Sequence, residues 1–261
     1  MAIRGVLFDL DGTLYQQGRA VTGAPEAVAQ CRRAGLPVGF VTNTTSRPRR
    51  VIQARLEGYG FAIEAAEISS ALLAGAAWLR SSGATRVAAY VPAAAHEDLA
   101  GVTITDERPD AVLVGDLDTG WDFAHLNGAF LHLMHGARLV ALSRDRYWLS
   151  EQGLRLDSGT IVAALEYAAG AQSVLCGKPS ATFYEAALGA LGDGLAPADV
   201  LMVGDDLWGD IQGAQRLGFK TCLVRTGKYR ADAFVASRVT PDYVVDSVAD
   251  VPALLAAPSP Q

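Results

Sequence analysis

The sequence has little cysteine and no long hydrophobic run, and each absence excludes a class of protein. Its 261 residues include three cysteines, Cys31, Cys176 and Cys222, which show no CxxC spacing. Neither a disulfide framework nor a zinc site is therefore expected, and buried, inert thiols are. No stretch reaches the roughly 18 consecutive apolar residues of a membrane span, and no long apolar leader precedes the first strand pattern. We expect a cytoplasmic protein without a membrane partner.

Positive charge is also scarce. Lysine and arginine number 22 against 28 aspartates and glutamates, the formal net charge is -6, and no basic stripe is present. A nucleic-acid partner is therefore not expected, and an anionic ligand would have to be attracted locally. The chain is long for one compact domain and half of its residues are hydrophobic. These values predict a core with a second, inserted domain.

Short apolar runs alternate with helical patterns and predict an α/β fold with a doubly wound parallel sheet. The predicted strands are residues 3–8, 38–41, 174–176, 200–203 and 221–224. Ligands of such sheets bind at the carboxyl ends of the strands. Polar or charged residues follow the first four of these strands, and we expect all four groups to face one crevice.

The interval between the second and third of these strands is far longer than a crossover connection needs. It predicts a smaller α/β cap domain at residues 82–172, inserted into a catalytic core of residues 1–81 and 173–261. The cap pattern predicts strands at residues 86–91, 111–114 and 139–142 and helices near 123–134 and 159–169. Residues 13–41, by contrast, have room only for a hairpin and one helix.

An aspartate pair follows the first predicted strand, in the string DLDGTL at residues 9–14. A carboxylate can attack a phosphoryl group when a divalent cation and nearby positive charge neutralise both partners, so Asp9 is a candidate nucleophile. Asp11 is a candidate general acid that protonates the leaving group and then acts as base toward water. An isolated pair of this kind is more often a turn, but the full string after a buried strand favours function.

Asp205 and Asp206 follow the fourth predicted strand and precede a helix that carries Asp210. Hard oxygen ligands at a strand end suit Mg²⁺. Two more carboxylates in a crevice that already holds Asp9 and Asp11 would repel one another without a cation between them. The clustering therefore predicts a metal site, and it leaves open whether Asp206 binds metal or caps the helix.

Candidate phosphate-binding residues follow the second and third predicted strands. Thr42, Asn43 and Thr44 offer hydroxyl, amide and backbone donors to phosphoryl oxygens. Lys178 offers a compact cation that can bind phosphate and neutralise Asp9. Each residue type is common in turns or on surfaces, so the signal lies in their shared place at strand ends.

With these motifs in this order, the chain resembles the haloacid dehalogenase superfamily over its whole length. The insertion between the second and third motifs is similar to the large cap of subclass IIA, which contains nitrophenylphosphatase-like, nucleotide and pyridoxal phosphate phosphatases. Residues 41–45, 165–168, 204–206, 213–218 and 225–229 are most similar to the phospholysine phosphohistidine inorganic pyrophosphate phosphatases. Several members of that group have serine at the place of Asp11, and its retention here favours turnover.

The resemblance also implies a role for each motif residue. Asp9 would be the nucleophile and a Mg²⁺ ligand, and Asp11 the acid and base that also binds the metal through its backbone carbonyl. Asp205 would be the third protein ligand, with Asp210 a supporting carboxylate behind the ligands. The transferring phosphoryl group would be held by Thr42, Asn43 and Lys178. The subclass commonly dimerises through its cap, which implies a homodimer.

Specificity is expected to come from the cap, because the core motifs bind only the phosphoryl group. The segment at residues 143–148 follows a predicted cap strand and combines two arginines with two aromatic residues in an expected loop. Arginines can pair with a second anionic group, and aromatic rings can stack on a ring or a cation. The candidate specificity residues are Arg144, Arg146, Tyr147 and Trp148.

The sequence thus predicts a Mg²⁺-dependent phosphatase that acts on a small phosphorylated substrate through an aspartyl-phosphate on Asp9. A receiver domain shares this chemistry but is shorter and needs neither Asp11 nor an insertion. A P-type ATPase requires membrane helices, and a phosphomutase usually has its cap between the first two motifs. A non-catalytic phospho-ligand-binding or regulatory protein on the same fold stays an alternative, since fold alone does not decide function.

Overall fold

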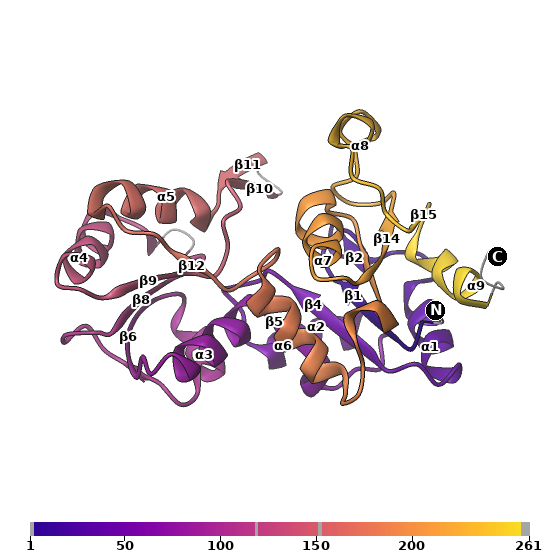
Figure 1. Ribbon diagram of the computed structural model, residues 1–261, viewed down its shortest axis with the longest axis horizontal. Helices are drawn as coiled ribbons and strands as arrows, with labels where there is room; N and C mark the ends of the chain where they lie inside the picture. The colour runs from indigo at the N-terminus through magenta and orange to yellow at the C-terminus, as the bar shows by residue number, and fades with distance from the viewer. Residues whose placement is uncertain (1–2, 118–119, 151–152, 257–261) are drawn as a thin grey trace. The chain divides into compact units, whose positions relative to one another are not determined.

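The computed structural model describes residues 3–117, 120–150 and 153–256 of the chain, which form two compact units (Figure 1). The first unit comprises residues 1–42, 50–69 and 184–261, and the second comprises residues 43–49 and 70–183. Each unit is built on its own sheet. The doubly wound α/β core and the inserted α/β segment predicted from the sequence are thus both present.

The first unit contains a six-stranded sheet with β1 at its centre. Its order is β15-β14-β13-β1-β4-β5, and β1 pairs in parallel with both β4 and β13. The chain therefore builds the sheet outward from β1 in two directions, which makes the boundary between β1 and β13 a topological switch point. The strands are β1 Gly5–Asp9, β4 Val38–Thr42, β5 Ile68–Ser70, β13 Val200–Gly204, β14 Lys220–Val224 and β15 Tyr243–Val245.

Helices cover both faces of this sheet, and the alternation of side chains along each strand explains why. Phe8 and Phe40 belong to the same hydrophobic core as residues of α1 (Ala24–Arg33) and α2 (Arg49–Gly58). Gly39 faces the other way, where an added methyl group would contact Leu191 of α6 (Ala181–Leu191). Smaller elements complete the unit: β2 Tyr15–Gln16, β3 Arg19–Ala20, α7 Gly213–Gln215, α8 Ala231–Ser237 and α9 Val251–Ala256.

The second unit contains a five-stranded sheet of order β12-β9-β8-β6-β7. Val112 and Val114 of β8 pack with α4 (Phe123–Met134) and α5 (Ser158–Ala169), whereas Leu113 between them faces Gly75 of α3 (Ala71–Ser81). Figure 1 accordingly shows α3 on one side of this sheet and α4 and α5 on the other. The strands are β6 Arg86–Tyr90, β7 Thr103–Ile104, β8 Ala111–Val114, β9 Arg138–Ala141 and β12 Val174–Leu175, and a separate antiparallel hairpin is formed by β10 Tyr147–Ser150 and β11 Gly153–Leu156.

Most predicted elements are confirmed within one or two residues, including β8 and α4, whose bounds match those predicted. Residues 13–41 contain the β2–β3 hairpin and α1, as their length indicated. None of the helices in the described part of the chain is long and apolar enough to span a membrane.

One predicted strand lies in the wrong sheet. Residues 174–176 were expected to form a strand of the core sheet, but β12 pairs with β9, with Val174 opposite Val140 and Leu175 opposite Ala141. A short apolar run of this kind fits either sheet, and in the structure it forms an edge strand of the second sheet beside β9. Lys178 therefore follows a strand of the second unit rather than of the core sheet.

The specificity segment at residues 143–148 is also more regular than the expected loop. Tyr147 and Trp148 belong to β10 and pair with Leu156 and Arg155 of β11. The prediction of a loop throughout this segment is wrong, because its last two residues form antiparallel pairs with a strand that follows shortly after them in the chain.

The second unit is wider than the cap predicted at residues 82–172. Gly75 of α3 lies against Leu142 and Leu113, and Thr45 Oγ1 accepts a 2.7 Å hydrogen bond from the backbone N–H of Asp116. Helix α3 and residues 43–49 consequently pack with the second unit. The exact borders of the inserted domain stay a prediction.

Candidate active site

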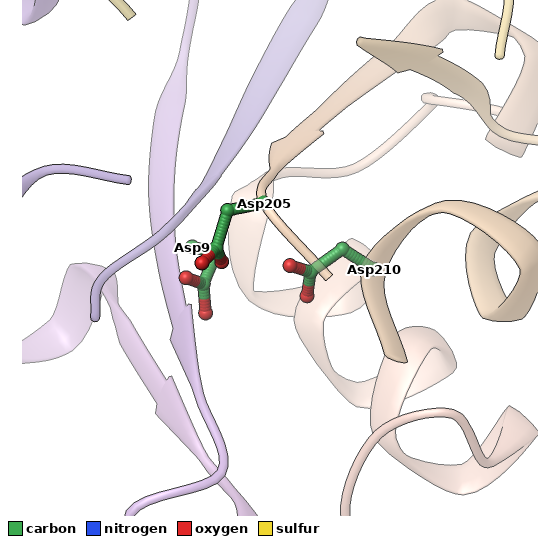
Figure 2. A group of neighbouring side chains, drawn as sticks. All are labelled: Asp9, Asp205 and Asp210. Atoms are coloured by element: carbon green, nitrogen blue, oxygen red, sulfur yellow. The ribbon is translucent and has the colours of Figure 1, made fainter. Parts of the chain in front are cut away.

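Three buried carboxylates meet at the switch point of the core sheet. Asp9 ends β1, and Asp205 follows β13, the strand paired with β1 through Phe8 and Val203. Asp210 lies on the π-helical turn η5 (Leu207–Gln212), and its carboxylate points toward the other two (Figure 2). One oxygen from each carboxylate lies within 4.8 Å of the others, and the three residues are at most 5% exposed. The strand-end motifs predicted metal ligands at Asp9, Asp11 and Asp205 with Asp210 behind them, whereas the cluster brings together the side chains of Asp9, Asp205 and Asp210 and does not include that of Asp11.

The electrostatics of this cluster favour a bound cation. Burial raises the pKa of Asp205 well above its usual range, and the neighbouring carboxylates of Asp9 and Asp210 raise it further. The ionised forms of the three groups repel one another in a site that water reaches poorly. A divalent cation with a preference for carboxylate oxygens would relieve this repulsion. The residues present therefore fit a hard divalent metal ion.

Asp206 has a different role from its neighbour. Its Oδ1 accepts hydrogen bonds from the backbone N–H groups of Trp208 and Gly209, at 2.9 and 3.0 Å, and so caps η5. Its Oδ2 pairs with Nζ of Lys228 at 2.8 Å. Burial by itself would raise the pKa of Asp206, but the Lys228 ammonium and the two N–H donors lower it to about 2. The capping role that the sequence left open is therefore filled by Asp206.

Glycines make room for the carboxylates. A methyl group added to Gly12 or Gly227 would overlap Oδ2 of Asp205, and one added to Gly204 would overlap the carboxylate of Asp210. Gly12 and Gly227 also have positive φ angles, of 89° and 58°, which side chains disfavour. The packing of this site depends on backbone that carries no side chain.

Asp11 is exposed and has a buried partner. The hydroxyl of Tyr15 donates a 2.8 Å hydrogen bond to Asp11 Oδ2. Burial raises the pKa of Tyr15, and the charge of Asp11 raises it further, so the phenol keeps its proton over the physiological range. Tyr15 thereby restrains Oδ2 of Asp11, and Oδ1 takes no part in this hydrogen bond.

The candidate phosphate-binding residues Asn43 and Lys178 are joined to each other within the second unit. Lys178 N donates to Asn43 Oδ1 at 2.7 Å, and Asn43 Nδ2 donates to the Lys178 carbonyl at 3.2 Å. Lys178 is 6% exposed. Thr42 is buried at the end of β4, next to Val41, which lies opposite Asp9 in the register of β1 and β4. Thr44 follows in the same segment and is half-buried.

The four candidate specificity residues divide into two groups. Arg144 forms an ion pair with Glu166 of α5 at 2.6 Å and donates to Ser173 Oγ at 3.2 Å, so its guanidinium is committed within the second unit. Arg146 lies over the ring of Tyr147, and Arg155 lies over the ring of Trp148. Tyr147 and Trp148 are 55% and 40% exposed. The hairpin therefore presents two aromatic rings, each with a cation beside it.

Sequence reasoning missed the partners that hold the acidic residues. Tyr15 lies four residues after Asp11, and Lys228 belongs to the segment that follows β14. The candidate residues predicted from the sequence follow only four of the predicted strands. The fifth predicted strand, residues 221–224, is followed by the segment that contains Lys228. Because ligands of such sheets bind at the carboxyl ends of the strands, the segment after residues 221–224 could also have been predicted to belong to the site.

Comparison with known proteins agrees with the motifs. A family model described as haloacid dehalogenase-like hydrolase matches residues 6–105, and one described as HAD-hydrolase-like matches residues 175–251. Human haloacid dehalogenase-like hydrolase domain-containing protein 2 is 39% identical over 88% of this chain and 87% of its own length. Human phospholysine phosphohistidine inorganic pyrophosphate phosphatase is 34% identical, over 97% of this chain and 94% of its own.

A solved structure extends the similarity to the arrangement of the elements. The p-nitrophenyl phosphatase from Archaeoglobus fulgidus matches with a TM-score of 0.90 and 27% identity, covering 97% of this chain and all of that one. The predicted resemblance to the large-cap, nitrophenylphosphatase-like subclass is thereby confirmed. The motifs, the acidic cluster and the relatives that match over most of its length together show that the chain belongs to the haloacid dehalogenase-like hydrolase family.

Proposed function

We propose that this protein is a Mg²⁺-dependent phosphatase that hydrolyses a small phosphorylated metabolite through an aspartyl-phosphate on Asp9. The substrate would be a phosphoester, a phosphoramidate or pyrophosphate. The observation that carries the proposal is the cluster of Asp9, Asp205 and Asp210, buried at the switch point with exposed Asp11 two residues from the first of them. Relatives named as phosphatases over nearly the full length support the same reaction class.

Mg²⁺ would be held by Asp9, Asp205 and the backbone carbonyl of Asp11, with Asp210 adding negative charge to the site. When bound, Mg²⁺ supplies charge neutralisation to the attacking carboxylate and to the phosphoryl oxygens. Asp9 is suited to nucleophilic attack because a strand end holds its carboxylate in a fixed direction.

Asp11 is suited to move the proton. In the first half of the reaction, a carboxylate oxygen of Asp9 attacks phosphorus, the bond between phosphorus and the leaving group breaks, and Asp11 gives a proton to the leaving oxygen or nitrogen. In the second half, Asp11 takes a proton from the water that cleaves the aspartyl-phosphate, which restores both groups. The Tyr15 hydroxyl occupies Oδ2 of Asp11, so Oδ1 is the oxygen we assign to this transfer.

The phosphoryl group would be bound by Thr42, Asn43, Thr44 and Lys178. The reciprocal hydrogen bonds between Asn43 and Lys178 support this assignment, because they fix the backbone that carries the lysine. We assign recognition of the leaving group to the cap hairpin through Arg146, Tyr147 and Trp148. A homodimer formed through the cap and a cytoplasmic location stay expectations.

Metal removal tests the proposed function directly. Excess chelator should abolish hydrolysis of a generic aryl phosphate, and added Mg²⁺ should restore it, because Asp9 cannot approach a phosphoryl group with both charges uncompensated. The measurement is steady-state release of the phenol with and without chelator. Undiminished turnover in chelator would overturn the metal requirement, and no turnover under either condition would favour the non-catalytic alternative.

Asp205→Asn should stabilise the metal-free protein while removing its response to metal. The raised pKa means that Asp205 ionises only above the usual carboxyl range near pH 4, so metal-free wild type should lose stability as pH rises through that raised pKa. The neutral amide removes this loss. The melting temperature in chelator should rise by about 2–4 °C per kcal/mol of relieved repulsion, and Mg²⁺ should no longer raise it.

The comparison is made by thermal unfolding at several pH values between about 5 and 8, with chelator or Mg²⁺. Asp193→Asn, a change at an exposed aspartate, serves as the matched control and should behave as wild type. An Asp205→Asn protein that is less stable than wild type in chelator and still stabilised by Mg²⁺ would contradict the assignment.

The two aspartates of the first motif should differ in kinetics. Asp9→Asn should abolish turnover, and no phosphoenzyme should be recovered after an acid quench, because the amide is not a nucleophile. Asp11→Asn should slow turnover by about 10²- to 10⁴-fold, and by less for a substrate whose leaving group needs no protonation. Rapid-quench measurement of phosphoenzyme and product distinguishes the two. Wild-type turnover in Asp9→Asn would place the nucleophile elsewhere.

The cap hairpin should affect specificity without affecting the core chemistry. The double variant Arg146→Ala/Trp148→Ala removes one cation and one ring that lie in the hairpin. Across a panel of phosphorylated metabolites it should raise KM for the preferred substrate or change the order of preference, while hydrolysis of a small aryl phosphate and Mg²⁺ affinity stay near wild type. An unchanged profile would rule this hairpin out as the specificity element.

A further inference from the structure

The segment after β14 contacts the loops that carry the acidic cluster, and no step of the proposed reaction uses it. We call Thr226, Gly227 and Lys228 the β14 clasp. Its three residues contact the loop after β1 and the loop after β13 by separate interactions. All of these residues belong to the first unit.

The clasp holds the carboxylate of Asp205 by a backbone donor. The Lys228 N–H donates a 2.6 Å hydrogen bond to Asp205 Oδ2. This bond fixes the rotation of a buried carboxylate that its neighbours Asp9 and Asp210 repel. Hydrogen bonds of this kind to a metal-binding carboxylate orient it and typically matter for metal affinity.

The clasp also holds the loop after β1. Thr226 Oγ1 donates a 2.5 Å hydrogen bond to the Gly12 carbonyl, and the Gly227 N–H donates to Gln16 Oε1 at 3.3 Å. Gly12 directly follows Asp11. The hydroxyl of Thr226 therefore restrains the turn on which Asp11 lies.

Gly227 has no room for a side chain. An added methyl group would overlap Asp205 Oδ2 and would lie 2.5 Å from the Cα of Gly12. The backbones of the two loops are therefore in direct contact at this point. A larger residue would have to push Asp205 or the turn after Asp11 out of place.

The side chain of Lys228 completes the set of contacts. Its Nζ pairs with Asp206 Oδ2 at 2.8 Å, and Asp206 caps the turn η5 that carries Asp210. One three-residue segment thus contacts Asp205 directly, and Asp11 and Asp210 through their neighbours.

We infer that the β14 clasp is a positioning element for the divalent cation, which sets the separation between the loops after β1 and β13. It does not touch the substrate or the reacting atoms in this assignment. The inference rests on the proposed function, since it requires a cation bound by Asp9 and Asp205. It adds Thr226, Gly227 and Lys228 to the residues on which metal affinity depends.

Mg²⁺ binding measured by calorimetry, without substrate, tests the clasp. Gly227→Ala should raise the Kd for Mg²⁺ by about 10- to 100-fold, the range typical when outer partners of metal ligands are altered. Gly35→Ala is the matched control, because Gly35 also has a positive φ, of 79°, but a methyl group there would contact nothing within 4 Å. It should bind Mg²⁺ with the wild-type Kd.

A second pair of variants tests the same idea without steric strain. Thr226→Val removes the hydroxyl that donates to Gly12 and should weaken Mg²⁺ binding severalfold, whereas Thr226→Ser keeps the donor and should bind as wild type. Melting temperatures in chelator establish that each variant is folded. If Gly227→Ala does not fold, the Thr226 pair decides.

The possible results separate the clasp from the proposed function. Wild-type binding of Mg²⁺ together with equal Kd values for Gly227→Ala and Gly35→Ala, or for Thr226→Val and Thr226→Ser, would overturn the clasp alone. A wild-type protein that binds no Mg²⁺ would overturn the proposed function and, with it, the clasp.

Discussion

The mutual repulsion of three buried carboxylates is the constraint on which the rest of the site depends. Asp9, Asp205 and Asp210 lie with oxygens within 4.8 Å of one another, and burial makes their charged forms costly. A protein gains no stability from such an arrangement in itself. The cluster is best understood as a site kept ready for a cation, at some expense to the stability of the metal-free fold.

The surrounding backbone is arranged to hold this unfavourable geometry. Glycines at positions 12, 204 and 227 allow loops from three strands to approach the carboxylates where any side chain would overlap them. Asp206 and Lys228 form an ion pair at the edge of the cluster, and Lys228 also bonds Asp205 through its N–H. Rigid packing and satisfied hydrogen bonds thus oppose the electrostatic tendency of the loops to separate.

The sequence alone was sufficient for much of the fold and for the central residues of the site. Apolar runs predicted β1, β4, β13 and β14 of the core sheet and β6, β8 and β9 of the second sheet, because parallel strands buried on both faces require such runs. The short strands β5, β7 and β15 were not predicted. Asp9 and Asp205 could be predicted because each directly follows one of these runs, and strand ends meet at one edge of a parallel sheet. Their chemistry followed from residue type and order.

Only the tertiary structure decided how these parts pair and what surrounds each charge. Residues 174–176 are too short a run to specify a partner strand, and the pairing of β12 with β9 is evident only in the folded structure. Asp205 and Asp206 are identical in type and adjacent in sequence, yet their pKa values shift in opposite directions. The carboxylate of Asp9 lies beside Asp205, whereas the ammonium group of Lys228 pairs with Asp206. Both neighbours are distant in sequence, so the two opposite shifts arise only once these segments have packed together.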